Sequence, residues 1–348
     1  MLKKIGKFFF GLFKVLLVLF LIFSLVYLSI SVFNTKVDNK FQLYIGNFAK
    51  AAPWLSDWND TSIDDIYAKL GENNDNIIAA EIYTKACEKL MLVPAYGVRA
   101  ISTIVAVSGG IQVDVANNRT EQYRAAGTPT LNANQKIYSS YTNTIYVTEV
   151  NNEVIGAILK GAIQFADRGY SDGTAKYKQK GKLSVMDDDG EVITWATEYA
   201  PEEASAERVY RDDEIREKGN YIINADTIMP GSVEIEREFD EDVGMYLYKI
   251  AFNLDCSTHE EGSATYYEAK AVGDVLGGFM ESLIYNYMKV EMTMYSNGYF
   301  MTFDSAQEWT LTFSVGSLLR LAGTATNTRS EVLSYDSRDC EVVNFTAK

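Results

Sequence analysis

An uninterrupted apolar run near the N-terminus most constrains what this chain can fold into. Residues Val15–Phe33 (VLLVLFLIFSLVYLSISVF) are nineteen residues without a single charge. A helix of ~20 apolar residues spans the hydrocarbon core of a bilayer and satisfies its own backbone hydrogen bonds there. The run is longer than the ~7–15-residue apolar core of a cleaved signal peptide, and no Ala-x-Ala cleavage site follows it. The sequence therefore predicts an uncleaved transmembrane helix over residues 15–33, which anchors the chain in a lipid bilayer.

The charges beside this run predict its orientation. Four lysines precede it, namely Lys3, Lys4, Lys7 and Lys14. Because basic residues are retained on the cytoplasmic side, residues 1–14 are expected in the cytoplasm and the C-terminal part outside the cell membrane. Residues 34–59 are rich in aromatic side chains, and we expect a juxtamembrane stalk that lies against the bilayer or packs on the following domain. Residues 60–348 are then expected to form the extracytoplasmic domain.

The part of the chain beyond the membrane is strongly acidic. Removing the six lysines and one aspartate of residues 1–40 from the totals of 32 basic and 47 acidic residues leaves a net charge of −20. Such a charge argues against nucleic acid and anionic lipid head groups as general partners, and it favours solubility. A hydrophobic content of 47%, with 23 Tyr and 17 Phe, is ample for a folded core.

The three cysteines lie far apart, at Cys87, Cys256 and Cys340. No C-x-x-C pair exists, so neither a structural zinc site nor a thioredoxin-like motif is encoded locally. Cys256 and Cys340 could pair in an oxidising compartment, although so few cysteines indicate a fold that does not rely on disulfides. Cys87 falls on the apolar stripe of a predicted helix, which indicates a buried and unreactive thiol.

Hydrophobic periodicity predicts two helices followed by antiparallel strands. Residues 61–70 and 76–92 are predicted as helices, and apolar residues of the second recur at three and four residues. From residue 98 the period changes to two, as in strands. Glycine-containing turns at Gly109–Gly110, Asp187–Gly190 and Asn297–Gly298 then predict hairpins, the last with a type I′ turn.

Two stretches show the clearest strand alternation. One is Tyr246, Tyr248, Ile250, Phe252 and Leu254; the other is Met288, Val290, Met292 and Met294, followed after the turn by Met301 and Phe303. Alternate residues of a strand share one face of the sheet. Methionine adapts to irregular apolar shapes and is frequent at promiscuous binding surfaces. The same pattern is typical of an ordinary core beneath a sheet, which is the interpretation that the sequence favours for these residues.

No sequence motif for catalysis was found. His259 is the only histidine, and its HEEG context is not the H-E-x-x-H of zinc proteases. The chain contains neither a G-x-S-x-G nucleophile elbow nor a P-loop. Glycoside hydrolysis needs only two carboxylates, but nothing among 47 acidic residues singles out a pair. The sequence therefore predicts no catalytic, cofactor or metal site and indicates a protein that is not an enzyme.

The order of the predicted elements resembles a known family. A helix is followed by a hairpin through VSGG into IQVDV, then by NYIINADTI, MYLYKIAFNLD, ATYYEAKAVGDV and the meander VEMTMYSNGYFMTFDSAQEWTLTF. Over residues 60–336 this order resembles the extracytoplasmic domains of the lipoprotein-carrier superfamily (the LolA/LppX-like fold). The resemblance implies an α+β fold, in which a curled, mostly antiparallel sheet forms an incomplete barrel with a few packed helices and an apolar concavity. The lipobox cysteine of lipidated relatives is absent, and no binding residue can be carried over individually.

Together, these features predict a membrane-anchored extracytoplasmic protein whose concave sheet face accepts an apolar or lipid ligand. The candidate lining consists of alternating residues of three predicted strands: Tyr246, Tyr248, Ile250, Phe252, Met292, Met294, Met301 and Trp309. The alternative is a structural, interaction or sensor protein of the cell envelope with a fully packed core and no ligand. The sequence indicates no particular protein partner.

Overall fold

The computed structural model describes the chain from residue 60 onward, with gaps. The described residues are 60–71, 75–127, 137–153, 156–157, 164–187, 190–197, 200–203, 223–258, 260, 263, 265–266, 280–315 and 319–346. The predicted cytoplasmic segment 1–14, transmembrane helix 15–33 and stalk 34–59 lie outside these residues. Among the residues that are described, no helix has the length and apolar character needed to cross a membrane.

Two helices begin the described chain and confirm the predicted helix pair. They are α3 (Ser62–Tyr67) and α4 (Asp75–Leu92). Twelve strands follow in the described residues: β1 (Ala95–Ser108), β2 (Ile111–Ala125), β3 (Ile137–Val150), β4 (Phe165–Ser171), β5 (Ala175–Asp187), β6 (Gly190–Trp195), β7 (Ala200–Glu203), β8 (Glu234–Asp240), β9 (Met245–Asn253), β10 (Met280–Tyr295), β11 (Phe300–Val315) and β12 (Leu319–Ser334). The described part of the protein is therefore mostly β.

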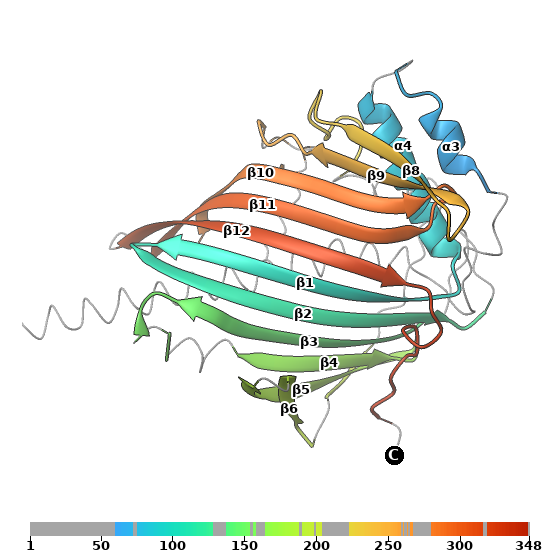
Figure 1. The fold of residues 1–348 in the computed structure, drawn as a ribbon. Helices are drawn as coiled ribbons and strands as arrows, with labels where there is room; N and C mark the ends of the chain where they lie inside the picture. The colour runs from blue at the N-terminus through green and yellow to red at the C-terminus, as the bar shows by residue number, and fades with distance from the viewer. Residues whose placement is uncertain are drawn as a thin grey trace, which may run out of the picture.

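The strands form one antiparallel sheet whose two halves are joined by the last strand (Figure 1). The order is β6-β5-β4-β3-β2-β1-β12-β11-β10-β9-β8, and β7 pairs with β5 beside this path. Strand β12 lies between β1 and β11, so the C-terminal strand links the first six strands to the later ones. The predicted antiparallel sheet is confirmed.

The incomplete barrel that the resemblance implies is not formed, since the sheet is neither closed nor strongly curled. Curling needs bulges or glycine kinks that bend successive strands. The pairings of β12 with β1 and β11, and of β1 with β2, run in register without any shift. The centre of the sheet therefore lacks the irregularities that would fold it into an incomplete barrel.

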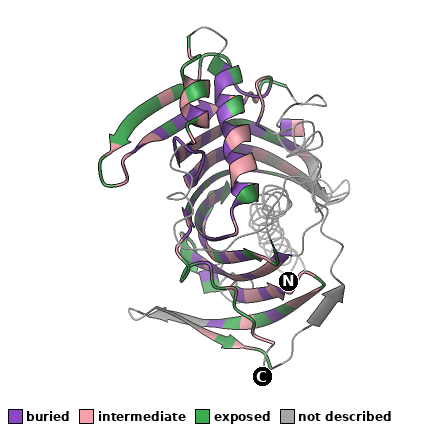
Figure 2. Cartoon of the chain, turned by 90° about the vertical axis from the view of Figure 1, so that its right-hand side faces the viewer, coloured by how far each residue is buried: buried purple, intermediate pink, exposed green. Residues whose placement is uncertain are grey.

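The two faces of the sheet differ sharply in burial (Figure 2). We call the face against which α4 packs the inner face and the opposite one the outer face. Along β12, residues from Ala322 to Leu333 alternate strictly between exposed and buried. Helix α4 covers one end of the inner face, where the ring of its Tyr83 lies 6.2 Å from Phe300 and 6.4 Å from Phe303. One part of the hydrophobic core thus lies between α4 and the sheet, and the core continues along the inner face to Ala106, Val113 and Trp309.

The hairpin turns show how local sequence sets strand register. Ser108 pairs with Ile111, and Gly109 and Gly110 between them have φ of 59° and 83°. The sequence predicts a hairpin here, and positive φ at both central residues is that of a two-residue type I′ turn. Between β10 and β11, the Gly298 N–H donates to the Tyr295 carbonyl and Gly298 has φ of 86°. The loop therefore has three residues, 296–298, where the predicted Asn-Gly type I′ turn has two. Gly298 takes the left-handed conformation that ends such a three-residue loop.

The C-terminal segment after Tyr335, residues 336–346, packs on the outer face. A Cβ added to Gly97 of β1 would lie only 2.3 Å from the carbonyl oxygen of Asp339, so glycine permits this close approach. The Val343 N–H donates to Ser140 Oγ at 2.9 Å. The guanidinium of Arg168 lies 4.6 Å from the Phe345 ring and 4.5 Å from the Trp195 ring. The segment therefore ties β1 to β3 and β4.

All three cysteines are free thiols. Cys256 Sγ donates to the Leu254 carbonyl and Cys340 Sγ to the Ser334 carbonyl, so the pairing that the sequence left open is not formed. Cys87 is buried on α4 as predicted, and burial raises the pKa of its thiol to about 12. A thiol with so high a pKa is unreactive at neutral pH.

Candidate functional site

The structure brings the predicted lining residues together on the inner face. Ile250 of β9 pairs directly with Met292 of β10, and Tyr248 pairs with Met294. Most of the set is buried in the hydrophobic core: Tyr248, Ile250, Phe252, Met292, Met294 and Trp309. Tyr246 and Met301 are partly buried and pack against the same core. Six of the eight positions are thus closed to solvent and two are partly exposed, and a ligand-lining role for them stays a prediction.

Helices α3 and α4 cover the end of the inner face that holds the tyrosines of this set. The Tyr248 hydroxyl donates to the Asp64 carboxylate of α3, and its ring meets Tyr67 edge-on at 5.2 Å. Burial, reinforced by Asp64, raises the pKa of Tyr248. These contacts are those of a packed core, so this end of the face is closed by the helices.

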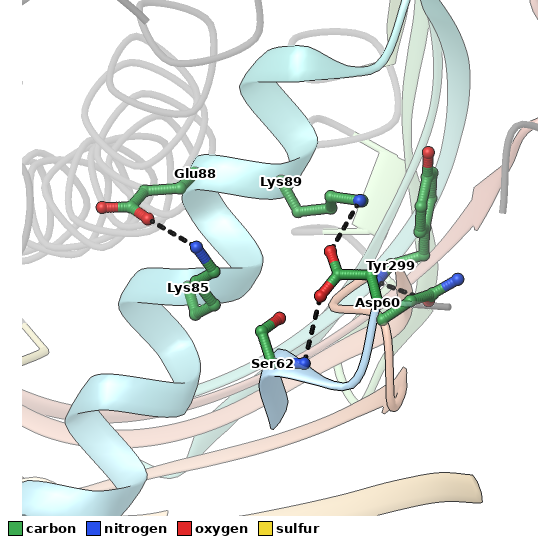
Figure 3. Close-up of polar contacts among 7 residues, drawn as sticks. Asp60, Ser62, Lys85, Glu88, Lys89 and Tyr299 are labelled. Atoms are coloured by element: carbon green, nitrogen blue, oxygen red, sulfur yellow. Dashed lines mark hydrogen bonds and ion pairs between the residues drawn. The ribbon is translucent and has the colours of Figure 1, made fainter. Parts of the chain in front are cut away.

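Polar contacts fasten the two helices to the sheet at this end (Figure 3). Lys89 Nζ lies 3.0 Å from the Asp60 carboxylate and 5.1 Å from the centre of the Tyr299 ring. The other oxygen of Asp60 accepts from the Ser62 N–H at 3.0 Å. Burial opposes ionisation of Asp60, but the hydrogen bonds from Lys89 and Ser62 outweigh it and lower its pKa. The start of α3 is thus held to the end of α4.

Beyond the helices, the centre of the inner face carries polar and charged side chains. We call these residues the polar belt: Ser102, Asn117, Arg119, Glu121, Asn143, Asp167, Ser305, Gln307, Asn327, Arg329 and Glu331. Strand register aligns them across the sheet. Ser305, Arg329, Ser102 and Asn117 stand opposite one another on β11, β12, β1 and β2. The belt is therefore a continuous polar band and not a set of isolated residues.

Two buried ion pairs form the middle of the polar belt. Arg119 pairs with Glu121 on β2, and Arg329 pairs with Glu331 on β12. Ala100 of β1 stands opposite both Arg119 and Glu331, so the two pairs flank a single strand. Burial raises the pKa of Glu331, whereas Arg329 lowers it and Glu121 raises it again. Opposite charges in equal number reduce the cost of burying them.

Hydrogen bonds join the belt residues further. Ser102 Oγ donates to Asn327 Oδ1 at 2.8 Å. Asn143 Nδ2 and the Tyr141 hydroxyl each donate to one oxygen of Asp167 at 2.9 Å. Burial, followed by the charge of Asp167, raises the pKa of Tyr141. These hydrogen bonds fix the orientation of the Asn327 and Asn143 side-chain amides.

Four buried polar atoms in and beside the belt have no hydrogen-bond partner among the described residues. They are two acceptors, Asn117 Oδ1 and Asn143 Oδ1, and two donors, Gln307 Nε2 and Trp309 Nε1. Each of these side chains is 2–5% exposed. A buried polar atom without a partner costs ~1–3 kcal/mol, so each of these atoms would gain from a hydrogen bond to a bound molecule, water included. The arrangement can hydrogen-bond a molecule that offers both donors and acceptors.

Sequence reasoning missed the polar belt, although a signal was present. In β12, Thr324, Thr326 and Thr328 alternate along the strand, and the structure exposes all three on the outer face. The residues that alternate with these threonines along the strand must then point inward, and they include Asn327, Arg329 and Glu331. Arg329 and Glu331 alternate along β12 in step with the apolar residues Ala325 and Leu333, and this spacing was the available indication of buried charge.

Comparison with known proteins does not assign the chain to a class. No protein-family model matches the sequence, and no curated protein matches it. The fold and site therefore define only a mostly β protein with a helix-covered inner face and a buried polar belt. The resemblance to the lipoprotein-carrier superfamily stays a prediction.

Proposed function

We propose that this chain is a membrane-anchored extracytoplasmic protein that binds an amphiphilic ligand on the inner face of its sheet and catalyses no reaction. The observation that carries this proposal is the set of buried, unpartnered polar atoms beside buried apolar side chains of the same inner face. The polar part of an amphiphilic ligand would hydrogen-bond the unpartnered atoms, and its hydrocarbon part would contact the apolar side chains. The resemblance to lipoprotein carriers supports the same class of ligand.

The hydrocarbon part would lie beyond the polar belt, on the side away from α4. There Ala325 of β12 pairs with Ala106 of β1 on one side and with Trp309 of β11 on the other. The two alanines are small, and the Tyr285 ring lies 6.2 Å from the Trp309 ring. Burying hydrocarbon against such a surface contributes ~25 cal/mol per Å². The polar part would then reach the amide of Gln307, two residues along the same strand face.

Native mass spectrometry of the full chain, released from nanodiscs made of its host membrane, tests this proposal. We expect wild-type protein to retain an amphiphile, and Ala325→Trp to lose it because the indole fills the surface beside Trp309. The matched control is Thr326→Trp, which adds the same side chain to the exposed outer face of the same strand. Wild-type protein that is consistently ligand-free would contradict the proposal.

The proposed topology has its own test. Residues 15–33 would anchor the chain in the cell membrane, with residues 1–14 inside and the described domain outside. A protease added to intact cells should then remove a C-terminal epitope tag, while an N-terminal tag stays protected until the membrane is broken. Protection of the C-terminal tag would contradict an extracytoplasmic domain.

A specific observation favours a second function, that of an envelope structural, interaction or sensor protein without a small ligand. Five predicted lining residues are 0–1% exposed, as in an ordinary core: Tyr248, Ile250, Phe252, Met292 and Met294. Chemical crosslinking in intact cells distinguishes the two. A stoichiometric protein partner, together with ligand-free protein in the mass spectra, would support this second function.

A further inference from the structure

The sheet ends at a strand that is paired on one side only. Strand β8 pairs with β9 and is the last strand of the sheet (Figure 1). None of its seven residues, Glu234–Asp240, is buried. Apart from a turn bond at the Asp240 carbonyl, the backbone groups that point away from β9 have no backbone partner among the described segments. We call this side of β8 the free edge, and its open N–H and C=O groups are a template for another strand.

Three acids lie along the free edge on the outer-face side. Glu234, Glu236 and Glu238 are exposed and, as alternate residues of one strand, stand ~7 Å apart in a row. None of the three lies within ion-pair distance of a cation in the part of the chain that the structure describes. Lys249 stands directly opposite Glu236, but its Nζ lies 3.1 Å from Glu291 on its other side. The edge therefore presents a row of negative charges that the sheet leaves without close partners.

The inner-face side of the same edge carries apolar surface. The Phe239 side chain is 51% exposed, and its ring meets Tyr246 of β9 edge-on at 5.1 Å. Phe239 stands opposite Tyr246 in the strand pairing, so it points to the side on which Tyr248 is buried. A strand added along β8 would cover this ring on one side and face the three glutamates on the other.

A second copy of this chain does not suit the free edge. Antiparallel pairing of β8 with itself about Arg237 sets Glu236 opposite Glu238. It also sets Glu234 opposite Asp240. Like charges directly opposite each other destabilise a sheet, and charged edge strands commonly prevent such self-association. The same charges attract a strand of opposite charge, so the edge discriminates between these two kinds of partner.

We propose that β8 binds an extended segment of a partner protein, which adds one strand to the sheet and carries lysine or arginine at alternate positions. Alternate residues of the added strand repeat every ~7 Å, so three basic side chains stand opposite the three glutamates. The apolar residues between them lie on the side of Phe239. Backbone hydrogen bonds supply the affinity of such strand addition, and the side chains supply its specificity.

Fluorescence anisotropy of the full chain in phosphatidylcholine nanodiscs tests the free edge, with labelled Lys-Val-Lys-Val-Lys-Val-Lys as the probe. We expect saturable binding of this peptide. The control Lys-Pro-Lys-Pro-Lys-Pro-Lys has the same charge, but proline lacks the N–H and the backbone geometry of a paired strand. It should bind about tenfold more weakly or not at all. Equal binding of the two peptides, or no binding of the first, would overturn the proposal.

Hydrogen–deuterium exchange locates the bound peptide. The Lys-Val peptide should slow exchange in residues 234–240 and leave β6, at the other end of the strand order, unchanged. Binding without protection of β8 would overturn the proposal. Protection that rises with protein concentration in detergent, without any peptide, would show that a second copy occupies the edge and would overturn it as well.

Two charge-matched variants assign the binding to the row of glutamates. Glu236→Lys turns the central attraction into a repulsion and should weaken binding of the Lys-Val peptide by about fivefold or more. Glu308→Lys makes the same charge change at an exposed position of β11 and should weaken binding by less than about twofold. Equal losses in the two variants would reduce the interaction to net charge and overturn the proposal. The inner face takes no part in these measurements, so this proposal and the proposed function can fail separately.

Discussion

The helix-covered end of the inner face and the polar belt belong to the same strands but differ in what surrounds their side chains. At the covered end, Met294 and Phe300 are fully buried, and the Tyr83 ring of α4 packs on the strands. In the belt, equally buried positions hold Arg329, Glu331 and amides with unpartnered atoms. The difference indicates that stability is concentrated under the helices, whereas the belt retains polar groups at a cost to stability.

The largest effect is expected from a truncation at the helix-covered end. Phe300→Ala removes a fully buried ring that meets Tyr83 of α4, and it should lower the free energy of unfolding by about 3–5 kcal/mol. Urea denaturation of the full chain in nanodiscs measures this. The control Val332→Ala alters a side chain that is 50% exposed on the outer face and should change stability by less than ~0.5 kcal/mol. Equal losses of stability in the two variants would show that packing of α4 on Phe300 does not stabilise the fold.

A slightly smaller loss is expected from breaking an ion pair in the belt. Arg329→Met leaves Glu331 buried without its nearest positive charge and should cost about 3 kcal/mol at neutral pH. The double variant Arg329→Met/Glu331→Leu removes both charges and should recover most of that loss. Chemical denaturation of the single and double variants forms a double-mutant cycle. A double variant as unstable as the single one would show that the pair matters for packing and not for charge.

The same pair predicts a pH dependence with a definite sign. Burial raises the pKa of Glu331 above its ordinary value of 4.5, so the folded state binds this proton more tightly than the unfolded state. Stability linked to this proton is therefore present at low pH and is lost as pH rises through the raised pKa. In Arg329→Met the fall of stability with rising pH should be steeper and should continue to higher pH, because Arg329 no longer lowers the pKa of Glu331. Urea midpoints measured between acidic and neutral pH check this, and a flat profile contradicts it.

Sequence patterns predicted the local parts of this fold better than the relations between distant parts. The period of α4 and the paired glycines 109–110 identified a helix and a turn because both signals are encoded within a few residues. The place of β12 between β1 and β11 could not be predicted, since alternation shows which residues share a face but not which strands are neighbours. The shared face of Ile250 and Met292 was predicted correctly, but its cover by the helices was not.

The turn glycines at opposite ends of the sheet allow a milder comparison. Gly298→Ala places a Cβ at positive φ and 3.3 Å from Lys89 Cβ of α4, and it should cost about 1–2 kcal/mol. Gly110→Ala imposes a similar φ of 83° in the β1–β2 turn, but its Cβ would meet nothing within 4 Å. Thermal unfolding of both variants separates backbone strain from contact with α4. A larger loss of stability for Gly110→Ala than for Gly298→Ala would contradict a close contact between the Gly298 turn and α4.

The smallest expected effect has the opposite sign. Gln307→Leu removes a buried donor that has no partner among the described residues, and it should raise the free energy of unfolding of ligand-free protein by up to about 1 kcal/mol. Asn327→Leu in the same belt should destabilise, because its amide oxygen accepts from Ser102. If the belt binds the polar part of an amphiphile, Gln307→Leu should also reduce ligand retention in native mass spectra. Stability that rises while binding falls would identify Gln307 as kept for a ligand, whereas a loss of both would make it an ordinary structural residue.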